Sequence, residues 1–336
     1  MRIAVDAGGA DLGPAEVAAG AAIAAARGIT PVLFGPAAEI GKLPAGIEVV
    51  DAPISIAKSA EPVSAVRSTP DASIVQAARA VAAGDCDALV AGGTTGAALA
   101  AGLFHIKRAR GIYRPALALP LPVPGAPVTL VDVGANVECR PEHLVQFAHM
   151  GAALAAVVLD VANPRVALLS NGEEAGKGTP LLQEAYAALQ ISAGLNFVGN
   201  VEGNDIVEGA ADVVVTDGFT GNVALKLIEG VSQMMMTKIR ERAESSPRAK
   251  LGGLLMRPAL RQFRDEIDPE GPGGAYLLGL RRLGVVPHGR FTRYGISQAI
   301  LLAARGATGD VVGRTHAALD AAGALRSPPA ATVSSS

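Results

Sequence analysis

The sequence has few aromatic residues and almost no cysteine. Of its 336 residues, 3% are aromatic, none is tryptophan and two are cysteines, Cys86 and Cys139. Two cysteines cannot form the disulfide framework of a small secreted domain, and they are too few for a cysteine-based zinc site. Because half of the residues are hydrophobic, the chain can instead build a large core from Ala, Val, Leu and Ile packed between helices and a sheet.

Long apolar runs and an excess of charge are also absent. The sequence holds no run of about 18 uncharged apolar residues, so we expect no membrane-spanning helix. Its start, Met1 to Asp6, predicts a buried strand rather than a secretory signal. Charged residues make up 18% and the net charge is −2, which argues against a general nucleic-acid-binding protein. We therefore expect a cytoplasmic protein without a nucleic-acid partner.

Short apolar runs alternate with longer Ala-rich runs, which predicts an α/β fold with a mostly parallel sheet and flanking helices. The runs are nearly all apolar, as expected when helices cover both faces of the sheet. We predict strands at residues 3–6, 30–34, 88–91, 128–133, 165–169 and 212–216. We predict helices at residues 14–26, 72–83, 97–110, 141–159, 180–192 and 221–244.

The chain shows no internal repeat. We expect residues 1–326 to form one α/β domain with two lobes around a cleft, and the Pro-rich residues 121–126 to connect the lobes. Residues 327–336, rich in Ser, Pro and Ala, predict a disordered tail.

Two glycine-rich segments follow predicted strands, where open α/β sheets bind ligands. The first runs from Asp6 through Gly9 to Pro14, and the second contains Thr94, Thr95 and Gly96. Glycines expose backbone N–H groups, and threonine hydroxyls add donors, so both suit a phosphate. Each is also compatible with a simple tight turn, because there is no Walker lysine and no dinucleotide fingerprint.

A third segment, residues 131–143, places Asp132, Asn136 and Glu138 at and beyond a strand end. Such polar side chains either fix a ligand or brace neighbouring loops. Cys139 is a poor candidate nucleophile without a base and a depressed pKa. His143, alone in the first turn of a helix, is expected to be structural.

Three further pieces carry candidate residues. Lys177 lies between glycines after a strand, and Asn200 and Glu202 follow the next apolar run. Asp217 to Asn222 opens a predicted helix. Lys177 can present a cation to an anion, and the amide of Asn222 can donate to an oxyanion. Taken singly, a solvated loop lysine and a helix cap would explain these two residues.

Together, the segments 131–143, 171–178, 200–203 and 217–222 resemble, in order and spacing, the acyl-carrier-protein:phosphate acyltransferase family, often called PlsX. The similarity extends from Met1 to about His288-Gly289. Thr94 stands where asparagine is usual in the family, and Gly8 and Ala10 replace Met and Gly. The resemblance implies a phosphate acetyltransferase or isocitrate dehydrogenase-like architecture. It also implies transfer of a fatty acyl group from acyl carrier protein to inorganic phosphate, for phospholipid synthesis.

This reaction joins an existing nucleophile to an activated thioester, so it needs no covalent intermediate, metal or cofactor. The protein must hold phosphate near the carbonyl and stabilise the oxyanion. We predict that Lys177 and Asn222 are the catalytic residues. The resemblance and the loop positions assign substrate or phosphate binding to Asp6, Gly9, Thr94, Thr95, Gly96, Asp132, Asn136, Asn200, Glu202, Asp217 and His288.

A basic segment with an apolar centre follows. Residues 221–266 predict a protruding helical hairpin whose cations surround Leu251, Leu254 and Leu255. Such a surface suits an anionic membrane or an acidic carrier protein. It also fits a pair of helices that forms a dimer. In the family that the sequence resembles, such a hairpin is associated with both dimerisation and peripheral membrane contact, and we expect both here.

Three other functions are compatible with these features. A coenzyme A-dependent phosphate acetyl- or butyryltransferase would share the fold and differ in its acyl donor. A nicotinamide-dependent hydroxy-acid dehydrogenase would require a nucleotide site and usually acidic metal ligands. A non-catalytic scaffold at a membrane surface would use the hairpin alone.

Overall fold

The computed structural model describes residues 1–125 and 127–326, and the predicted tail at 327–336 lies outside the described residues. Within the described residues, one sheet of eleven strands has the order β3-β2-β1-β4-β11-β10-β5-β6-β9-β7-β8. The strands are β1 (Arg2–Asp6), β2 (Thr30–Gly35), β3 (Glu48–Asp51), β4 (Ala88–Ala91), β5 (Ala116–Leu121), β6 (Val128–Val131), β7 (Arg165–Leu169), β8 (Asn196–Val201), β9 (Val213–Val215), β10 (Ala275–Leu278) and β11 (Leu283–Val286).

The sheet contains two parallel blocks that run in opposite directions. Strands β3, β2, β1, β4 and β11 are parallel to one another, and so are β6, β9, β7 and β8. Between the blocks, β10 is antiparallel to β11 and β5, and β5 is antiparallel to β6. The loops that follow β1 and β4 therefore leave one edge of the sheet, and those that follow β6, β9 and β7 leave the opposite edge.

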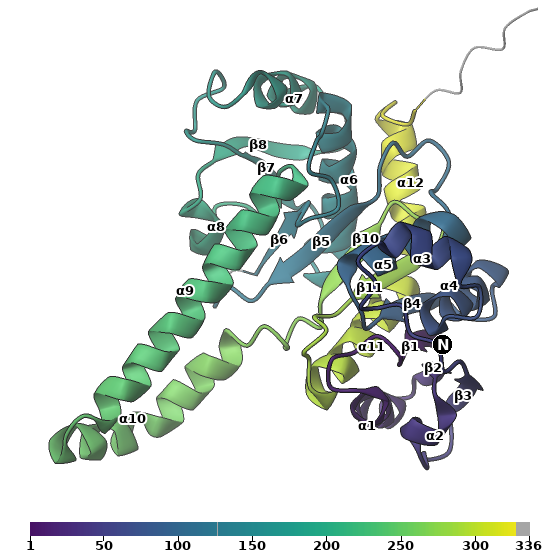
Figure 1. Cartoon of the computed structure of the whole chain (residues 1–336). Helices are drawn as coiled ribbons and strands as arrows, with labels where there is room; N and C mark the ends of the chain where they lie inside the picture. The colour runs from purple at the N-terminus through teal and green to yellow at the C-terminus, as the bar shows by residue number, and fades with distance from the viewer. Residues whose placement is uncertain (126, 327–336) are drawn as a thin grey trace, which may run out of the picture.

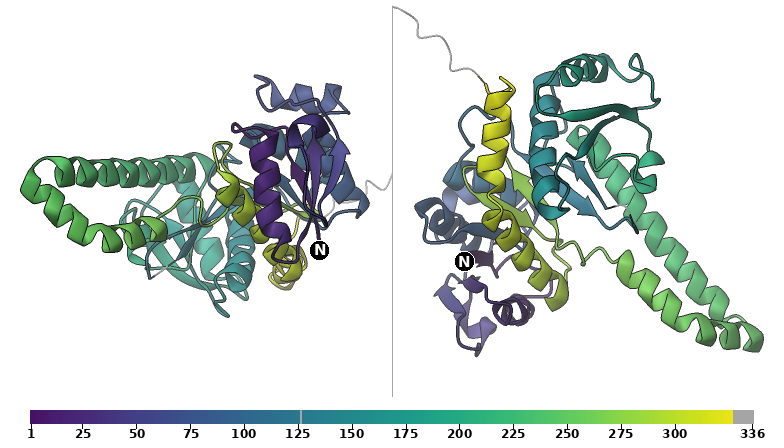
Figure 2. Two further views of the ribbon diagram at one scale, coloured as in Figure 1. Left: turned by 90° about the horizontal axis from the view of Figure 1, so that it is seen from below. Right: turned by 180° about the vertical axis from the view of Figure 1, so that it is seen from behind.

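Helices cover both faces of the sheet (Figures 1 and 2). They are α1 (Pro14–Ala25), α2 (Ala37–Ile40), α3 (Pro62–Ser68), α4 (Ser73–Ala83), α5 (Thr95–Ala101), α6 (Pro141–Val158), α7 (Pro180–Gln190), α8 (Asp205–Glu208), α9 (Gly218–Glu244), α10 (Pro247–Glu266), α11 (Arg293–Thr308) and α12 (Val311–Ala321).

The core is divided by the sheet into two clusters. Ile3 and Val5 of β1 belong to the cluster that also holds residues of α1, α6, α7, α11 and α12, whereas Ala4, between them, belongs to the cluster that holds residues of α3, α4 and α5. This alternation follows from the pleat, which points successive side chains to opposite faces. All four residues of β4 and of β6 are buried, as predicted for strands covered on both sides. The predicted α/β class and mostly parallel sheet are confirmed.

Two helices leave the body of the molecule as a hairpin. α9 extends from the end of β9, and α10 returns beside it (Figures 1 and 2). No residue of α10 is buried. The predicted protruding hairpin is thus confirmed, and it begins at Gly218, three residues before the predicted start.

The helix predicted at residues 97–110 is shorter and partly irregular. α5 ends at Ala101 and continues as a π-helical turn over Gly102–Ile106, after which Lys107 has a φ of +70° and ends the helix. A Cβ on Gly102 would lie 2.7 Å from Leu280 Cδ1. This glycine therefore permits the turn to pack directly on the segment after β10.

Candidate active site

The loops after β1 and β4 touch through their glycines. A Cβ on Gly9 would lie 2.7 Å from the backbone nitrogen of Gly93, so the loop after β1 has no room for a side chain at this position. Asp6 is buried beneath them and accepts hydrogen bonds from Ser73 Oγ at 2.6 Å and Gly8 N at 3.1 Å. Burial raises the pKa of Asp6 to about 6. These hydrogen bonds connect the loop after β1 to Ser73 at the start of α4.

The second of these loops begins helix α5. Thr94 is the N-cap, and its Oγ1 accepts a hydrogen bond from Ala97 N at 3.4 Å. Its hydroxyl proton is then available to a ligand in the adjoining cavity, which Thr94 and Thr95 both line. The predicted phosphate loop therefore borders a cavity, with its hydroxyls on the wall.

At the other edge of the sheet, Asp132 organises the loop after β6. Its buried carboxylate accepts hydrogen bonds from four backbone N–H groups, those of Leu117, Gly134, Ala135 and Asn136, at 2.8–3.2 Å. Asn136 Nδ2 donates to the same carboxylate at 2.8 Å and to Pro115 O at 2.7 Å. Burial raises the pKa of Asp132, and the backbone donors oppose that rise. Asp132 braces the loop, and Asn136 fastens it to the start of β5.

Helix α9 starts directly against this loop. A Cβ on Gly221 would lie 1.9 Å from Asp132 O, and one on Gly218 would lie 2.7 Å from Asn136 O. Asp217 caps the helix, because its Oδ1 accepts from Thr220 N at 2.9 Å. The two glycines and the aspartate of the 217–222 segment are thus explained by close packing and capping, and they bring Asn222 beside Gly134.

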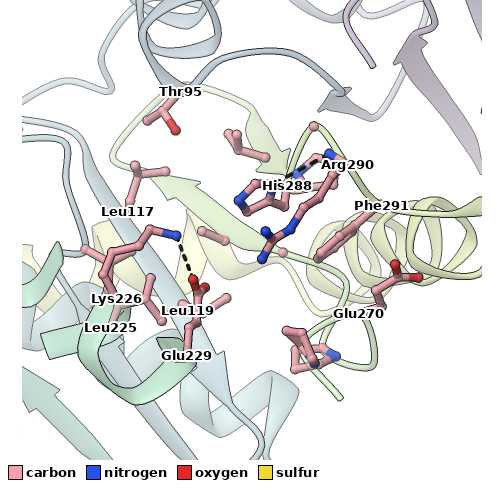
Figure 3. A pocket seen from close by; sticks show the side chains of 18 of the residues that line it. Thr95, Leu117, Leu119, Leu225, Lys226, Glu229, Glu270, His288, Arg290 and Phe291 are labelled. Atoms are coloured by element: carbon pink, nitrogen blue, oxygen red, sulfur yellow. Dashed lines mark hydrogen bonds and ion pairs between the residues drawn. The ribbon is translucent and has the colours of Figure 1, made fainter. Parts of the chain in front are cut away.

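A large cavity of about 980 Å³ lies between the loops after β1 and β4, strand β5 and the base of the hairpin (Figure 3). Five of the predicted site residues line it: Gly9, Thr94, Thr95, Asn222 and His288. Much of the remaining wall is apolar, and it includes Leu117, Leu119, Leu121, Val133, Leu225, Ile228, Met236, Val286 and Phe291. Donors of hydrogen bonds therefore face one cavity with a long apolar wall.

Charges in this cavity are balanced. Lys58, Lys226, Arg264 and Arg290 line it together with Asp11, Glu229, Asp268 and Glu270. Lys226 and Glu229 form an ion pair at 2.7 Å, whereas Arg290 approaches from the other side (Figure 3).

His288 also lines the large cavity, and its imidazole is in the neutral form. Burial, followed by the charges of Arg290 and Lys226, lowers its pKa. Its Nδ1 accepts a long hydrogen bond of 3.5 Å from Arg290 N, so the neutral ring carries its proton on Nε2. His288 can therefore donate one hydrogen bond from Nε2.

Other predicted site residues lie outside the lining of the large cavity. Lys177 follows β7, has a half-exposed side chain and lies 3.9 Å from Glu174. Asn200 Nδ2 donates to Glu174 O at 2.9 Å, and Glu202 N donates to Asp205 at 2.7 Å. Because β7 is adjacent and parallel to β9, the Lys177 loop and the start of α9 leave neighbouring strands at the same sheet edge.

Several lining residues were not predicted from the sequence. Lys226 lies four residues after Asn222 in α9, which places both on one helix face. That spacing could have indicated Lys226. Arg290 is two residues beyond His288, in a segment where no periodic pattern marks a site.

Cys139 does not have the environment of a nucleophile. Burial, and then the carboxylates of Asp132 and Asp217, raise its pKa to about 12. The thiol is therefore protonated at neutral pH, and only the thiolate is strongly nucleophilic. Within residues 1–125 and 127–326, no three His, Cys, Asp or Glu side chains are grouped so as to hold a metal ion.

The fold is similar to solved phosphotransacetylases. The EutD phosphotransacetylase of Staphylococcus aureus superimposes with a TM-score of 0.61 at 18% identity, covering 91% of this chain and 94% of that one. A 4-hydroxythreonine-4-phosphate dehydrogenase from Klebsiella pneumoniae gives a TM-score of 0.54 at 16% identity, covering 91% of this chain and 99% of that one. At these identities the likeness shows the architecture alone, and it confirms the architecture predicted from the sequence.

Sequence relatives identify the family. A family model described as "Fatty acid synthesis protein" matches residues 1–314. The Phosphate acyltransferase of Thermobifida fusca is 50% identical over 196 residues, 57% of this chain and just over half (54%) of that protein. The Phosphate acyltransferase of Thermus thermophilus is 44% identical over 307 residues, 90% of this chain and 94% of that protein. The chain therefore belongs to the phosphate acyltransferase (PlsX) family that its sequence resembles.

Proposed function

We propose that this protein transfers a fatty acyl group from the thioester of acyl carrier protein to inorganic phosphate, for phospholipid synthesis. The supporting observation is that Thr94, Thr95, Asn222 and His288 face one cavity whose long wall is apolar. Hydroxyl, amide and imidazole donors suit phosphate and a developing oxyanion. The apolar wall suits an acyl chain, because burying apolar surface is favourable.

The reaction balances without a further reactant. A phosphate oxygen attacks the thioester carbonyl carbon and forms a C–O bond, giving a tetrahedral oxyanion. The oxyanion collapses, the C–S bond breaks, and the thiolate takes the proton that hydrogen phosphate has released. The products are an acyl phosphate and the free thiol of the carrier.

Within this proposal, Asn222 donates its amide to the oxyanion, while Thr94 and Thr95 hold phosphate. His288 and Lys226 supply a neutral donor and a cation on the facing walls. Lys177 supplies a second cation from the loop next to the start of α9, at the same edge of the sheet. Asp6, Asp132, Asn136 and Asp217 position these loops.

Acyl phosphate is the product that tests the proposal. We expect purified protein, long-chain acyl carrier protein and phosphate to yield an acyl hydroxamate after trapping with hydroxylamine. Omitting phosphate should abolish it, and a metal chelator should leave it unchanged. Free fatty acid as the sole product would identify a thioester hydrolase and contradict the proposal.

We further propose that α9 pairs with α9 of a second copy. Apolar side chains recur every four residues along it, at Phe219, Val223, Leu227, Val231 and Met235, and all are exposed in the single chain. Consecutive members of this series are neighbours on the helix surface and form a row that winds around α9, and burying such side chains stabilises association. A monomer in sedimentation experiments at micromolar concentration would contradict this proposal.

A second exposed patch lies near the tip of the hairpin, and we propose that it contacts an anionic membrane. Leu251, Leu254 and Leu255 are 61–76% exposed, and Arg248, Lys250 and Arg257 surround them in α10. The described residues contain no helix long and apolar enough to cross a bilayer. Apolar insertion and attraction of cations to lipid would together give reversible binding, at roughly 1 kcal/mol per cation.

Replacing Leu254 and Leu255 by Glu tests this contact. Binding to anionic vesicles in a flotation assay should be lost, while activity on soluble acyl carrier protein is kept. High salt should weaken binding of the parent, because it screens the cations. A double variant that floats with vesicles as the parent does would rule out the tip as the anchor.

A further inference from the structure

A second cavity, of about 750 Å³, lies next to the large one. Gly96, Ala135 and Asn136 line it, whereas their chain neighbours Thr95 and Val133 line the large cavity. The two cavities therefore share a wall, made of the loop that starts α5 and the loop after β6.

The second cavity is strongly cationic. Four arginines line it, Arg108, Arg114, Arg140 and Arg326, and its described lining contains no aspartate or glutamate. By contrast, the large cavity has four Lys or Arg and four Asp or Glu in its lining. Guanidinium groups are suited to phosphate because they are planar, always charged and donate in pairs. We name this second cavity the arginine pocket.

Two of the four guanidinium groups have protein partners. Arg108 donates to the carbonyls of Ile112 and Tyr113, and Arg140 lies 3.5 Å from the carboxylate of Glu142. In contrast, the side chains of Arg114 and Arg326 make no ion pair or hydrogen bond within residues 1–125 and 127–326. The charge of Arg114 also reaches into the pocket: after burial, the charges of Arg140 and Arg114 lower the pKa of His143, another lining residue.

Much of the remaining wall of the arginine pocket is apolar, beside the polar side chains of Tyr113, Asn136 and His143. Its apolar part is formed by Val63 of α3, Leu99 of α5, Leu103 and Phe104 of the π-helical turn, and Pro115. Such a wall suits methyl and methylene groups more than a free phosphate ion. The ligand chemistry that fits is an elongated molecule with an uncharged body and at least one phosphate.

We propose that the arginine pocket binds the phosphorylated pantetheine arm of the acyl donor, with the phosphate held by Arg114 and Arg326. The thioester then lies at the shared wall, beside Gly96 and Asn136, and the acyl chain extends into the large cavity. This inference rests on the proposed function, because it assigns a place to the donor of that reaction. Acyl carrier protein and acyl coenzyme A carry the same arm, so both donors would use the pocket.

Direct binding tests the pocket without requiring activity. Isothermal titration should show that the protein binds 4′-phosphopantetheine at least about tenfold more tightly than pantetheine, because charge-assisted hydrogen bonds to the phosphate are added. The double variant Arg114→Ala/Arg326→Ala should lose that difference. The matched control Arg110→Ala changes an exposed arginine close in sequence that does not line the pocket, and it should keep the difference. Equal affinity of the parent for both compounds would overturn the proposal.

Kinetics distinguish the arm from other donor contacts. In Arg114→Ala/Arg326→Ala the KM for acyl carrier protein and for acyl coenzyme A should rise about equally, by at least about tenfold, with the KM for phosphate unchanged. Arg114→Lys, which keeps a cation and tests folding, should restore part of the affinity. A rise with acyl carrier protein alone would place these arginines against the carrier's protein surface and contradict the proposal.

The proposed function and the assignment of the arginine pocket can be refuted independently of each other. If no donor yields acyl phosphate in the parent, the proposed function is wrong, and phosphopantetheine binding still decides whether the arginine pocket recognises the arm. If acyl phosphate forms but the parent binds phosphopantetheine and pantetheine equally, the function stands and the pocket assignment is wrong.

Discussion

The large cavity and the arginine pocket differ in charge although they share a wall. The large cavity has a mainly apolar wall and balanced charges, whereas the arginine pocket has four cations and no carboxylate among its described lining residues. One elongated substrate with an apolar chain at one end and a phosphate at the other would complement both. This difference places the reacting bond between the cavities, where the segments Thr94–Gly96 and Val133–Asn136 line both of them.

Gly221→Ala should disturb both cavities at once and have the largest effect. Its Cβ would lie 1.9 Å from Asp132 O, so α9 and the loop after β6 must separate, at a cost of about 1–3 kcal/mol or more. We expect loss of acyl transfer and of phosphopantetheine binding, with a lower melting temperature.

The matched control lies in the same helix. A Cβ on Gly230 meets nothing within 4 Å, so Gly230→Ala should keep both properties and gain up to about 1 kcal/mol of helix stability. If both alanines behave alike, close packing at Gly221 does not support the shared wall.

Asn222→Ala should impair the reaction in the large cavity and leave binding in the arginine pocket intact. Losing one oxyanion donor lowers kcat by about 10²–10³-fold, while binding of phosphopantetheine in the arginine pocket should be unchanged. Rapid-quench measurement of acyl phosphate formation gives kcat. A normal kcat with weaker donor binding would instead place Asn222 in donor recognition.

Lys177→Ala tests the cation that lines neither cavity. If it reaches phosphate from the adjacent loop, activity should fall about 10- to 100-fold, the cost of about 1.5–3 kcal/mol for a charged hydrogen bond. The loss should depend on phosphate concentration. Lys42→Ala, which changes an exposed lysine remote in sequence, serves as control. Unchanged phosphate kinetics in Lys177→Ala would show that Lys177 is a solvated loop lysine without a role in phosphate binding.

Asp6 should affect stability more than activity. Its folded-state pKa of about 6 lies above its ordinary value of 3.8, so the folded protein binds this proton more tightly than the unfolded chain. Its contribution to the free energy of unfolding is complete below about pH 4 and is lost as pH rises through about 6, by about 3 kcal/mol. Urea unfolding at several pH values should show that Asp6→Asn lacks this component. Identical pH dependence in both proteins would contradict it.

The sequence predicted the fold best where strands are buried in parallel blocks. Residues 88–91 and 166–169 are continuous apolar runs, and the strands predicted at 88–91 and 165–169 match β4 and β7. Strands β3, β5, β8, β10 and β11 were missed. In β5, Pro120 interrupts the apolar run, and glycines flank β10. Gly199 at φ +105° lies in β8, where the register with β7 also shifts.

The sequence identified the segments that form the candidate site, but not how these segments are arranged in space. Asp132, Asp217, Gly218 and Gly221 were found by their motifs, and their contacts explain those motifs as bracing, capping and close packing. Which loops line each cavity depends on the opposed directions of the two parallel blocks, and the three antiparallel pairings of β11 with β10, β10 with β5 and β5 with β6 set those directions. The arginine pocket had no motif, because its arginines come from positions 108 to 326.

The central claim is that a phosphate oxygen attacks the thioester carbonyl between the two cavities. The most direct measurement uses phosphate labelled with ¹⁸O at all four oxygens, long-chain acyl carrier protein and mass spectrometry of the acyl phosphate. We predict that all four labelled oxygens are retained, including the bridging one, with release of one thiol per product. An unlabelled bridging oxygen, or no acyl phosphate, would contradict the account.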